Sequence, residues 1–141
     1  MSNERVGIND DLLLIVKLID VAASLTGTTN QALEEFGLSE STGALLWSIT
    51  PEAEPVTMRQ LAKKLNFDPS NISLLSTRLE DLGLVERRPH PSDGRSRILA
   101  LTPEGNRVWH RLVERVLASS PLAKLTVAER LGLRDLLDKA Q

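Results

Sequence analysis

The sequence contains no cysteine, which excludes disulfide bridges, thiolate metal sites, cysteine nucleophiles and thiol-based oxidant sensing. Aromatic residues make up only 3% of its 141 residues, and leucine supplies most of the apolar content, which favours a helical protein. No basic segment followed by an apolar run and a small-residue cleavage site begins the sequence, so we expect no secretion. The longest uninterrupted apolar run, LLLIV, is far too short to cross a bilayer. We therefore expect a cytoplasmic protein with no membrane partner.

Histidine is also scarce, and its placement argues against an enzyme. The two histidines, His90 and His110, form no metal-ligand pair at i, i+4. The sequence contains no phosphate loop, dinucleotide-binding fingerprint or G-x-S-x-G motif. We interpret His90 as a solvated or phosphate-facing loop residue and His110 as a surface residue. The sequence predicts no enzymatic activity, no catalytic residue, no metal site and no cofactor.

Charge is distributed unevenly along the chain. The net charge is −2, but residues 57–102 hold eight basic and five acidic residues, which gives +3 there and leaves −5 for the remainder. Because salt screens distant charges, an anionic partner would meet the local excess and not the net value. A random fluctuation in composition explains the excess equally well at this stage.

The first predicted helix, residues 10–25, is apolar around almost its whole circumference. Lys17, Asp20 and Ser24 form a single narrow polar stripe at i, i+3 and i+7. Such a helix needs apolar partners on two sides. We expect one of them to be a second subunit, although a central helix in a monomer would show the same pattern.

Two short helices follow, each with a recognisable start. Ser39 is a good N-cap for a helix over residues 39–49. Thr57 and Gln60 form a capping box at the start of a helix over about 58–65. The intervening PEAEP segment, residues 51–55, predicts a loop.

A further helix begins only four residues later. Asp68 is a good N-cap, Pro69 suits the first helical position, and Gly83 suits the position just after the end at about Leu82. The apolar residues at spacings of 3, 4 and 3 predict a core-facing side; these are Ile72, Leu75, Leu79 and Leu82. Two short helices joined by a tight turn predict a helix-turn-helix.

A β-hairpin is predicted directly after this helix pair. LVERR and SRILALT flank the loop PHPSDG, and a hairpin in this place is a wing. Thr102 and Pro103 then predict the start of an apolar-sided helix that SSP at 119–121 ends. Thr126 and Glu129 form a capping box for a last helix to about residue 139.

The small polar side of the second helix and the arginines of the wing are the candidate DNA-binding residues. A hairpin tip is slim enough to bring Arg95 into a narrow, negative minor groove, with Arg97 just down the second strand. Asp93 would cap the turn or hold an arginine in place. The other interpretation is a solvated turn with weak surface ion pairs.

At this point the sequence resembles the MarR-type (multiple-antibiotic-resistance regulator) transcription factors. The resemblance rests on LAKKLNFDPSNISLLSTRLEDLGLVERRPHPSDGRSRILALTPEG at 61–105, which includes the Asp93-Gly94-Arg95 wing signature, and on LTVAERLGLRDLL at 125–137. It implies a mainly α fold with a small β-hairpin. Residues 33–105 would form the winged helix-turn-helix, and residues 1–32 and 106–141 would supply dimerisation helices.

The resemblance also implies a function and assigns the site. The protein would be a homodimeric regulator, most simply a repressor, on a pseudo-palindromic double-stranded DNA operator, with the recognition helix in the major groove and Arg95 in the minor groove. The expected DNA-binding residues are Ser70, Asn71, Ser73, Leu74, Thr77, Arg78, Arg95 and Arg97, and Asp93 would stabilise the wing. Leu74 departs from the polar or basic residue or glycine of many members, and would touch a thymine methyl or simply pack.

Two further questions stay open at the level of sequence. Family members often bind small anionic aromatic effectors between the dimer helices and the winged helix. Trp47 would line such a cleft or, more simply, belong to the core. The alternative function is a winged helix used only for protein–protein contact, which predicts no salt-dependent DNA binding.

Overall fold

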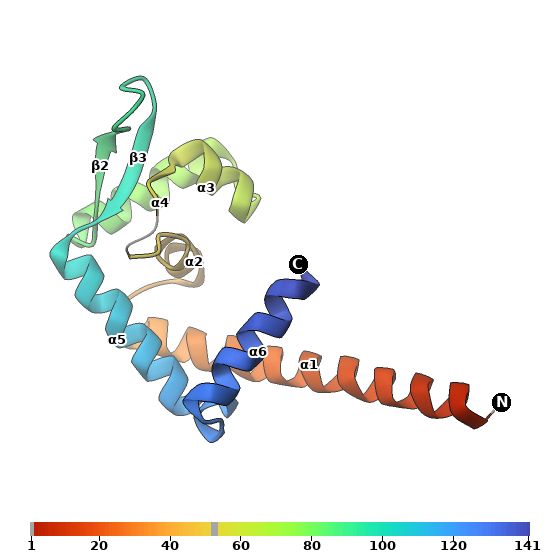
Figure 1. The fold of residues 1–141 in the computed structure, drawn as a ribbon. Helices are drawn as coiled ribbons and strands as arrows, with labels where there is room; N and C mark the ends of the chain where they lie inside the picture. The colour runs from red at the N-terminus through yellow and green to blue at the C-terminus, as the bar shows by residue number, and fades with distance from the viewer. Residues whose placement is uncertain (1, 52–53) are drawn as a thin grey trace. The chain divides into compact units, whose positions relative to one another are not determined.

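The computed structural model describes residues 2–51 and 54–141, with side chains from residue 7 onward. Helices dominate, and three short strands form one antiparallel sheet (Figure 1). The elements in chain order are α1 (Ser2–Glu35), α2 (Glu40–Ser48), β1 (Val56–Thr57), α3 (Met58–Leu65), α4 (Pro69–Asp81), β2 (Val85–Pro89), β3 (Arg97–Leu101), α5 (Pro103–Ser119), the 3-10 helix η1 (Pro121–Lys124) and α6 (Val127–Ala140). The predicted fold class, mainly α with a winged helix-turn-helix, is confirmed.

The chain divides into two compact units. The first combines the chain up to Gln31 with residues 114–141, and the second is residues 32–113. The second unit, the winged-helix unit, holds a continuous core between α2, α3 and α4. Its fully buried side chains include Leu45, Leu46, Leu61, Ile72 and Leu79. Because these residues recur at helical spacing, each short helix buries one side and leaves the other exposed.

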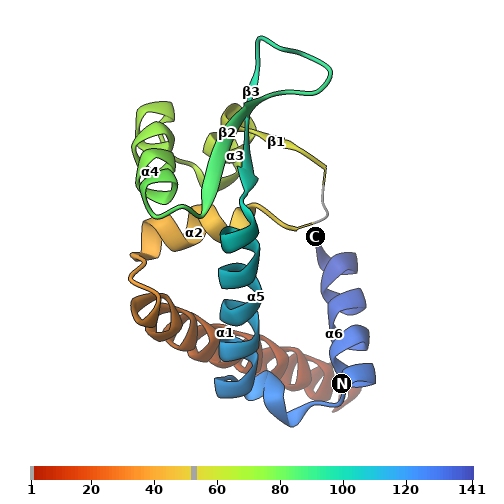
Figure 2. The ribbon, with the colours of Figure 1, turned by 90° about the vertical axis from the view of Figure 1, so that its left-hand side faces the viewer.

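The sheet has the order β1-β3-β2, so the predicted hairpin gains a third strand (Figure 2). In the wing, Val85 pairs with Leu101 and Pro89 pairs with Arg97. On the other side of β3, Val56 pairs with Leu99. The two residues of β1 were not predicted as a strand, because a segment this short has no detectable alternation and depends on a partner far along the chain.

Local start signals account for most helix boundaries. Ser39, Thr57 and Thr126 are N-caps with reciprocal capping boxes, although only the last two were predicted as boxes. Thr102 accepts a hydrogen bond from the Gly105 amide at 3.0 Å, as expected of an N-cap. Asp68 is the N-cap residue of α4, as predicted, but its side chain makes no capping hydrogen bond. An exposed carboxylate can be solvated by water instead.

The first helix is much longer than predicted, because no proline interrupts the chain before Pro51. It ends at Gly37, whose φ of 71° is left-handed, and the Leu38 amide donates to the Leu33 carbonyl at 2.9 Å. The stretch Gly7–Glu35 is long enough to cross a bilayer, and an 18-residue window within it is apolar enough, with a mean hydropathy of 1.6. The length of the run LLLIV therefore understates how apolar the whole helix is.

Candidate nucleic-acid interface

The two helices of the helix-turn-helix meet at a left-handed residue. Asn66 ends α3 with φ 53°, and the Phe67 amide donates to the Ala62 carbonyl at 2.9 Å. Asn tolerates this backbone region better than most residues, so it suits a tight turn. Pro69 then starts α4, which buries Ile72 and Leu79 against the core. The opposite side of α4 is thereby turned to solvent.

All six candidate residues of α4 are exposed; they are Ser70, Asn71, Ser73, Leu74, Thr77 and Arg78. Leu74 is 52% exposed, so it does not pack into the core as one interpretation of the sequence allowed. On the exposed side of α4 Leu74 lies among Asn71, Thr77 and Arg78, where its side chain is available for contact with another surface. The nearby Ser76 is buried and donates to the Ile72 carbonyl at 2.7 Å, so it serves the helix itself.

Asp93 organises the tip of the wing. Its carboxylate accepts hydrogen bonds from the Arg95 amide at 3.1 Å and the Ser96 hydroxyl at 3.2 Å. The Ser96 amide donates to the Asp93 carbonyl at 3.1 Å, and the His90 amide donates to the Ser96 carbonyl at 2.9 Å. Asp93 was expected either to cap the turn or to hold an arginine side chain in place. These hydrogen bonds are those of a turn cap.

His90 also belongs to the tip, where it is half-buried and accepts the Ser92 amide at Nδ1 over 3.0 Å. This geometry gives it a structural part in the loop. His110, by contrast, is exposed as expected, and its Nδ1 lies 2.8 Å from the Asn106 carbonyl.

The four arginines of the wing have different surroundings. Arg88 forms an ion pair with Glu86, and Arg87 forms one with Glu80 of α4. Arg95 and Arg97 are exposed, and within the part of the chain that the structure describes their guanidinium groups have no ion pair or hydrogen bond. The two wing arginines predicted to bind DNA are therefore those whose guanidinium groups are unpaired among the described residues.

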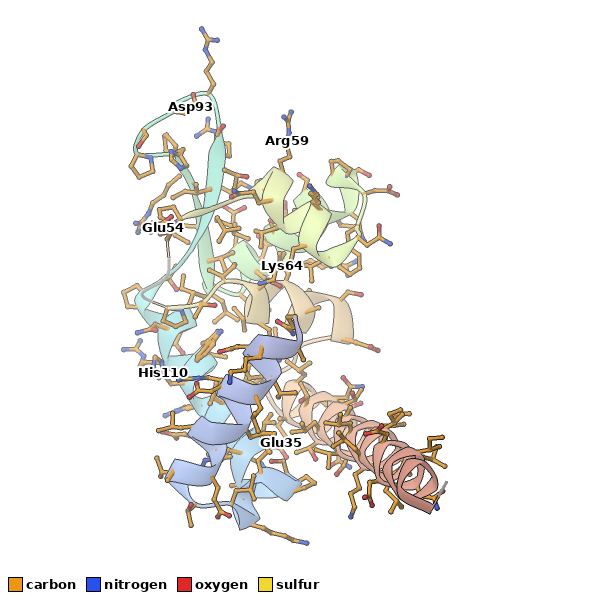
Figure 3. The ribbon with its side chains drawn as sticks, turned by 45° about the vertical axis from the view of Figure 1, so that its right-hand side comes forward. Glu35, Glu54, Arg59, Lys64, Asp93 and His110 are labelled. Atoms are coloured by element: carbon orange, nitrogen blue, oxygen red, sulfur yellow. The ribbon has the colours of Figure 1, made fainter. Side chains whose placement is uncertain are left out.

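One basic residue of this surface was not predicted. Arg59 lies in the first turn of α3, is exposed, and points to the same side as the wing tip that carries Asp93 (Figure 3). Arg59 belongs to the basic segment 57–102, but it is not among the DNA-binding residues expected from the sequence. The available signal was the composition of α3, which carries Arg59, Lys63 and Lys64 and no acidic residue.

A tryptophan pair lies in the same unit. The rings of Trp47 on α2 and Trp109 on α5 meet edge to face, with centroids 5.5 Å apart. Both indole Nε1 atoms are buried, and neither has a hydrogen-bond partner among the described residues. A cavity of about 600 Å³ lies elsewhere in this unit, between β3 and the segments 49–51 and 54–56, and neither tryptophan lines it. No group of three potential metal ligands occurs within residues 2–51 and 54–141.

Comparison with known proteins supplies the family. A sequence model of the MarR family matches residues 38–96. CouR from Rhodococcus jostii RHA1, whose crystal structure holds p-coumaroyl-CoA, is 30% identical, and the match covers 94% of this chain and 92% of that one with a TM-score of 0.68. The chain belongs to the MarR family. Members of this family are transcriptional regulators and not enzymes, so the predicted family and the predicted lack of enzymatic activity are confirmed.

Two further relatives extend the comparison. The transcriptional activatory protein BadR of Rhodopseudomonas palustris is 30% identical over 103 residues, which are 72% of this chain and 59% of BadR. The uncharacterized protein MJ0241 of Methanocaldococcus jannaschii is 46% identical over 52 residues, which are 37% of this chain. The match spans about a third of MJ0241, 33% of its length.

Proposed function

We propose that this MarR-family regulator is a homodimer that binds a pseudo-palindromic DNA operator, with α4 in the major groove and the wing arginine Arg95 in the minor groove. One observation carries this proposal: the exposed side of α4 and the exposed Arg95 and Arg97 belong to the same winged-helix unit. Among the described residues, the guanidinium groups of these two arginines have no partner. A helix with small polar side chains fits the major groove, and an arginine on a hairpin fits a narrow minor groove.

Arg59 adds a backbone contact to this arrangement. The first helix of a helix-turn-helix crosses the phosphate backbone, and Arg59 is exposed at the start of that helix. Phosphate contacts fix the register of the protein on the duplex, whereas contacts to base edges provide specificity. We therefore assign Arg59 and Arg97 to the backbone, and the side of α4 to the bases.

Dimerisation is proposed to use residues 1–32 and 106–141, which include the whole first unit, while residues 33–105 form the DNA-binding region. Eight large apolar side chains of α1, from Ile8 to Ile19, are 44–67% exposed, and four of α6 are 45–65% exposed. Fully burying one such side chain is worth about 1.5–3 kcal/mol, so a face of this size favours a partner. A second copy presents the same face and gives the two-fold symmetry that a palindromic operator requires.

Insertion of α1 into a membrane is disfavoured by its charges. Lys17 and Asp20 lie within the apolar stretch, and each costs about 2.5–3.5 kcal/mol near the centre of a bilayer. In a dimer both can lie at the edge of the interface, because they share one narrow stripe. A DNA-binding regulator must share a compartment with its operator, and so we propose a cytoplasmic location.

A small-molecule effector is the finer part of the proposal. The structure of CouR holds p-coumaroyl-CoA, and the tryptophan pair here offers two indole N–H donors without partners. An aromatic acid or its thioester would stack on the half-buried rings, and it would reach the buried N–H groups only after neighbouring side chains move apart. Because Trp47 and Trp109 are the only two tryptophans, quenching of intrinsic fluorescence by p-coumaroyl-CoA or p-coumarate reports directly on this site.

The DNA proposal is tested by selecting duplexes from a random pool with the purified protein, and then titrating the recovered duplex and a scrambled one at several salt concentrations. We expect tighter binding to the selected duplex and a linear fall of log K with log salt for both. Arg134→Ala on α6 serves as a control that removes a cation outside the winged-helix unit. Failure to bind any duplex at low salt would favour the alternative, a module for protein–protein contact.

Repression is the simplest outcome of operator binding, but BadR is named as an activator. A reporter gene placed behind the selected operator distinguishes the two. Lower expression with the protein present supports repression, and higher expression contradicts it.

A further inference from the structure

Arg87 leaves the wing and reaches the recognition helix. It lies on β2, yet its Nη2 donates to the Ser73 carbonyl at 2.7 Å and to the Thr77 hydroxyl at 3.0 Å. Its Nε lies 3.2 Å from a carboxylate oxygen of Glu80, an ion pair without the angle of a hydrogen bond. The two side chains of that pair are only 31% and 34% exposed. One guanidinium thus joins the strand to three residues of α4.

The three α4 residues share one side of the helix. Ser73, Thr77 and Glu80 follow one another at spacings of four and three, which places them in a single row. The Thr77 hydroxyl also donates to the Ser73 carbonyl at 3.0 Å, so its proton is already used when Arg87 approaches. Together these bonds occupy the Ser73 carbonyl and leave the Thr77 hydroxyl with one free lone pair.

A second row of α4 residues has no such partners among the residues that the structure describes. Asn71, Leu74 and Arg78 are spaced by three and four residues, and lie about a third of a turn around the helix from the Arg87 row. All three are exposed. An amide, an apolar group and a guanidinium are chemically suited to adenine, a thymine methyl and guanine or phosphate respectively.

We propose that Arg87 is a positioning residue that locks the recognition helix to the wing. It binds the Ser73 backbone carbonyl and the Thr77 hydroxyl for this lock, while the Asn71–Leu74–Arg78 row determines base preference. The inference rests on the proposed DNA-binding function and changes one part of it: Thr77, included above in the side of α4 that contacts the bases, serves the lock instead. Reading the major and minor grooves together requires a fixed distance between α4 and the wing tip. The planar guanidinium supplies that constraint, because it binds several acceptors at fixed angles, whereas an ammonium group does not.

The neighbouring arginine provides a matched control. Arg88 lies on the same strand and forms an ion pair with Glu86, away from α4. We would compare Arg87→Ala, Arg87→Lys, Glu80→Gln and Arg88→Ala, using the selected and the scrambled duplex as probes. Urea unfolding confirms that each variant is folded, and Glu80→Gln preserves shape if Arg87→Ala does not fold.

Under the proposal, Arg87→Ala weakens binding to the selected duplex by about tenfold or more, because each well-placed base contact contributes to discrimination. Binding to the scrambled duplex and the salt slope should stay close to wild type, since Arg87 neutralises no phosphate. Arg87→Lys and Glu80→Gln should show smaller losses of the same kind, and Arg88→Ala should show none. Equal losses on both duplexes with a salt slope reduced by about one would overturn the proposal and make Arg87 a phosphate contact.

Repeating the selection with further variants tests the division of α4. Leu74→Ala and Asn71→Ala should each alter base preference at one operator position, whereas Thr77→Val should leave every preferred base unchanged. A changed base for Thr77→Val would overturn the assignment.

Amide hydrogen exchange gives a readout without DNA: Arg87→Ala should accelerate exchange in β2 and α4, and Arg88→Ala should not. If the exchange result holds but no duplex is selected by wild type, the lock exists and the DNA-binding function has failed.

Discussion

Substitution of Gly105 by alanine should destabilise the protein, because there is no room for a Cβ atom at this position. A Cβ on Gly105 would lie 1.8 Å from the Leu84 carbonyl oxygen, which is backbone and cannot rotate away. That carbonyl also accepts the Thr102 amide at 3.0 Å, at the junction of α4, β3 and α5. Overpacking costs about 1–3 kcal/mol and loss of a hydrogen bond about 1 kcal/mol. The better helix propensity of alanine returns at most about 1 kcal/mol, so we expect a net loss of about 1–3 kcal/mol.

Urea unfolding followed by circular dichroism measures this loss, at one fixed protein concentration because a dimer unfolds in a concentration-dependent way. The midpoint should fall by roughly 1 M, given an m-value of about 1–3 kcal/mol/M. Gly132→Ala is the matched control, since its Cβ would meet nothing within 4 Å in the interior of α6. It should raise stability by about 0.4–1 kcal/mol. An unchanged or raised midpoint for Gly105→Ala would refute the close approach of Leu84 to α5.

The other predictions concern binding, assembly and pH. Asn71→Ala should weaken binding to the selected duplex by roughly 1–3 kcal/mol and leave the scrambled duplex unaffected in fluorescence anisotropy; equal losses would indicate a phosphate contact. Arg95→Ala should weaken binding most on A·T-flanked sites and reduce the salt slope, and Arg95→Lys should restore only part; unchanged affinity would remove the wing from the binding scheme. Ile15→Glu, at a side chain 54% exposed on α1, should yield monomers in sedimentation, and a persistent dimer would place the interface elsewhere. Hydrogen bonds from the Thr126 backbone and side chain lower the pKa of Glu129 in the folded state. Their contribution to the free energy of unfolding is therefore present above the unfolded-state pKa of Glu129, and it is lost as the pH falls through the folded-state pKa. Thr126→Val removes the side-chain bond and keeps the larger backbone one, so it should reduce but not abolish this part of the pH dependence of the urea midpoint; an identical profile would count against it.

The sequence could predict features that depend on neighbours along the chain. The capping boxes at Thr57 and Thr126 involve residues three apart, so their signal is local, and the structure has both. The wing follows from a Pro/Gly/Asp loop between two apolar segments. These local signals were enough to place the recognition helix and the wing tip in the sequence. They also predicted correctly that the candidate residues there are exposed.

Features that depend on distant residues were not predicted. β1 is a strand only because Val56 meets Leu99, more than forty residues away in the sequence. The contact of Arg87 with Ser73 likewise joins residues separated by 14 positions. Sequence reasoning could place Ser73 on the exposed side of α4, but it could not show that a strand residue already binds its carbonyl. The true length of α1 was missed for a different reason, since its apolar pattern fades after about residue 25, well before the terminating Gly37.

Pairing, rather than the count of basic residues, decides which charges can meet DNA. The segment 57–102 has a net charge of +3, but this excess is not spread evenly over its surface. Glu80 and Glu86 neutralise Arg87 and Arg88, the two arginines at the base of the wing. The carboxylate of Asp93 binds the backbone and a serine hydroxyl instead of an arginine, so it shapes the tip without forming an ion pair there. The acidic residues therefore remove charge where the wing joins α4 and leave it at the tip, where a minor groove would be reached.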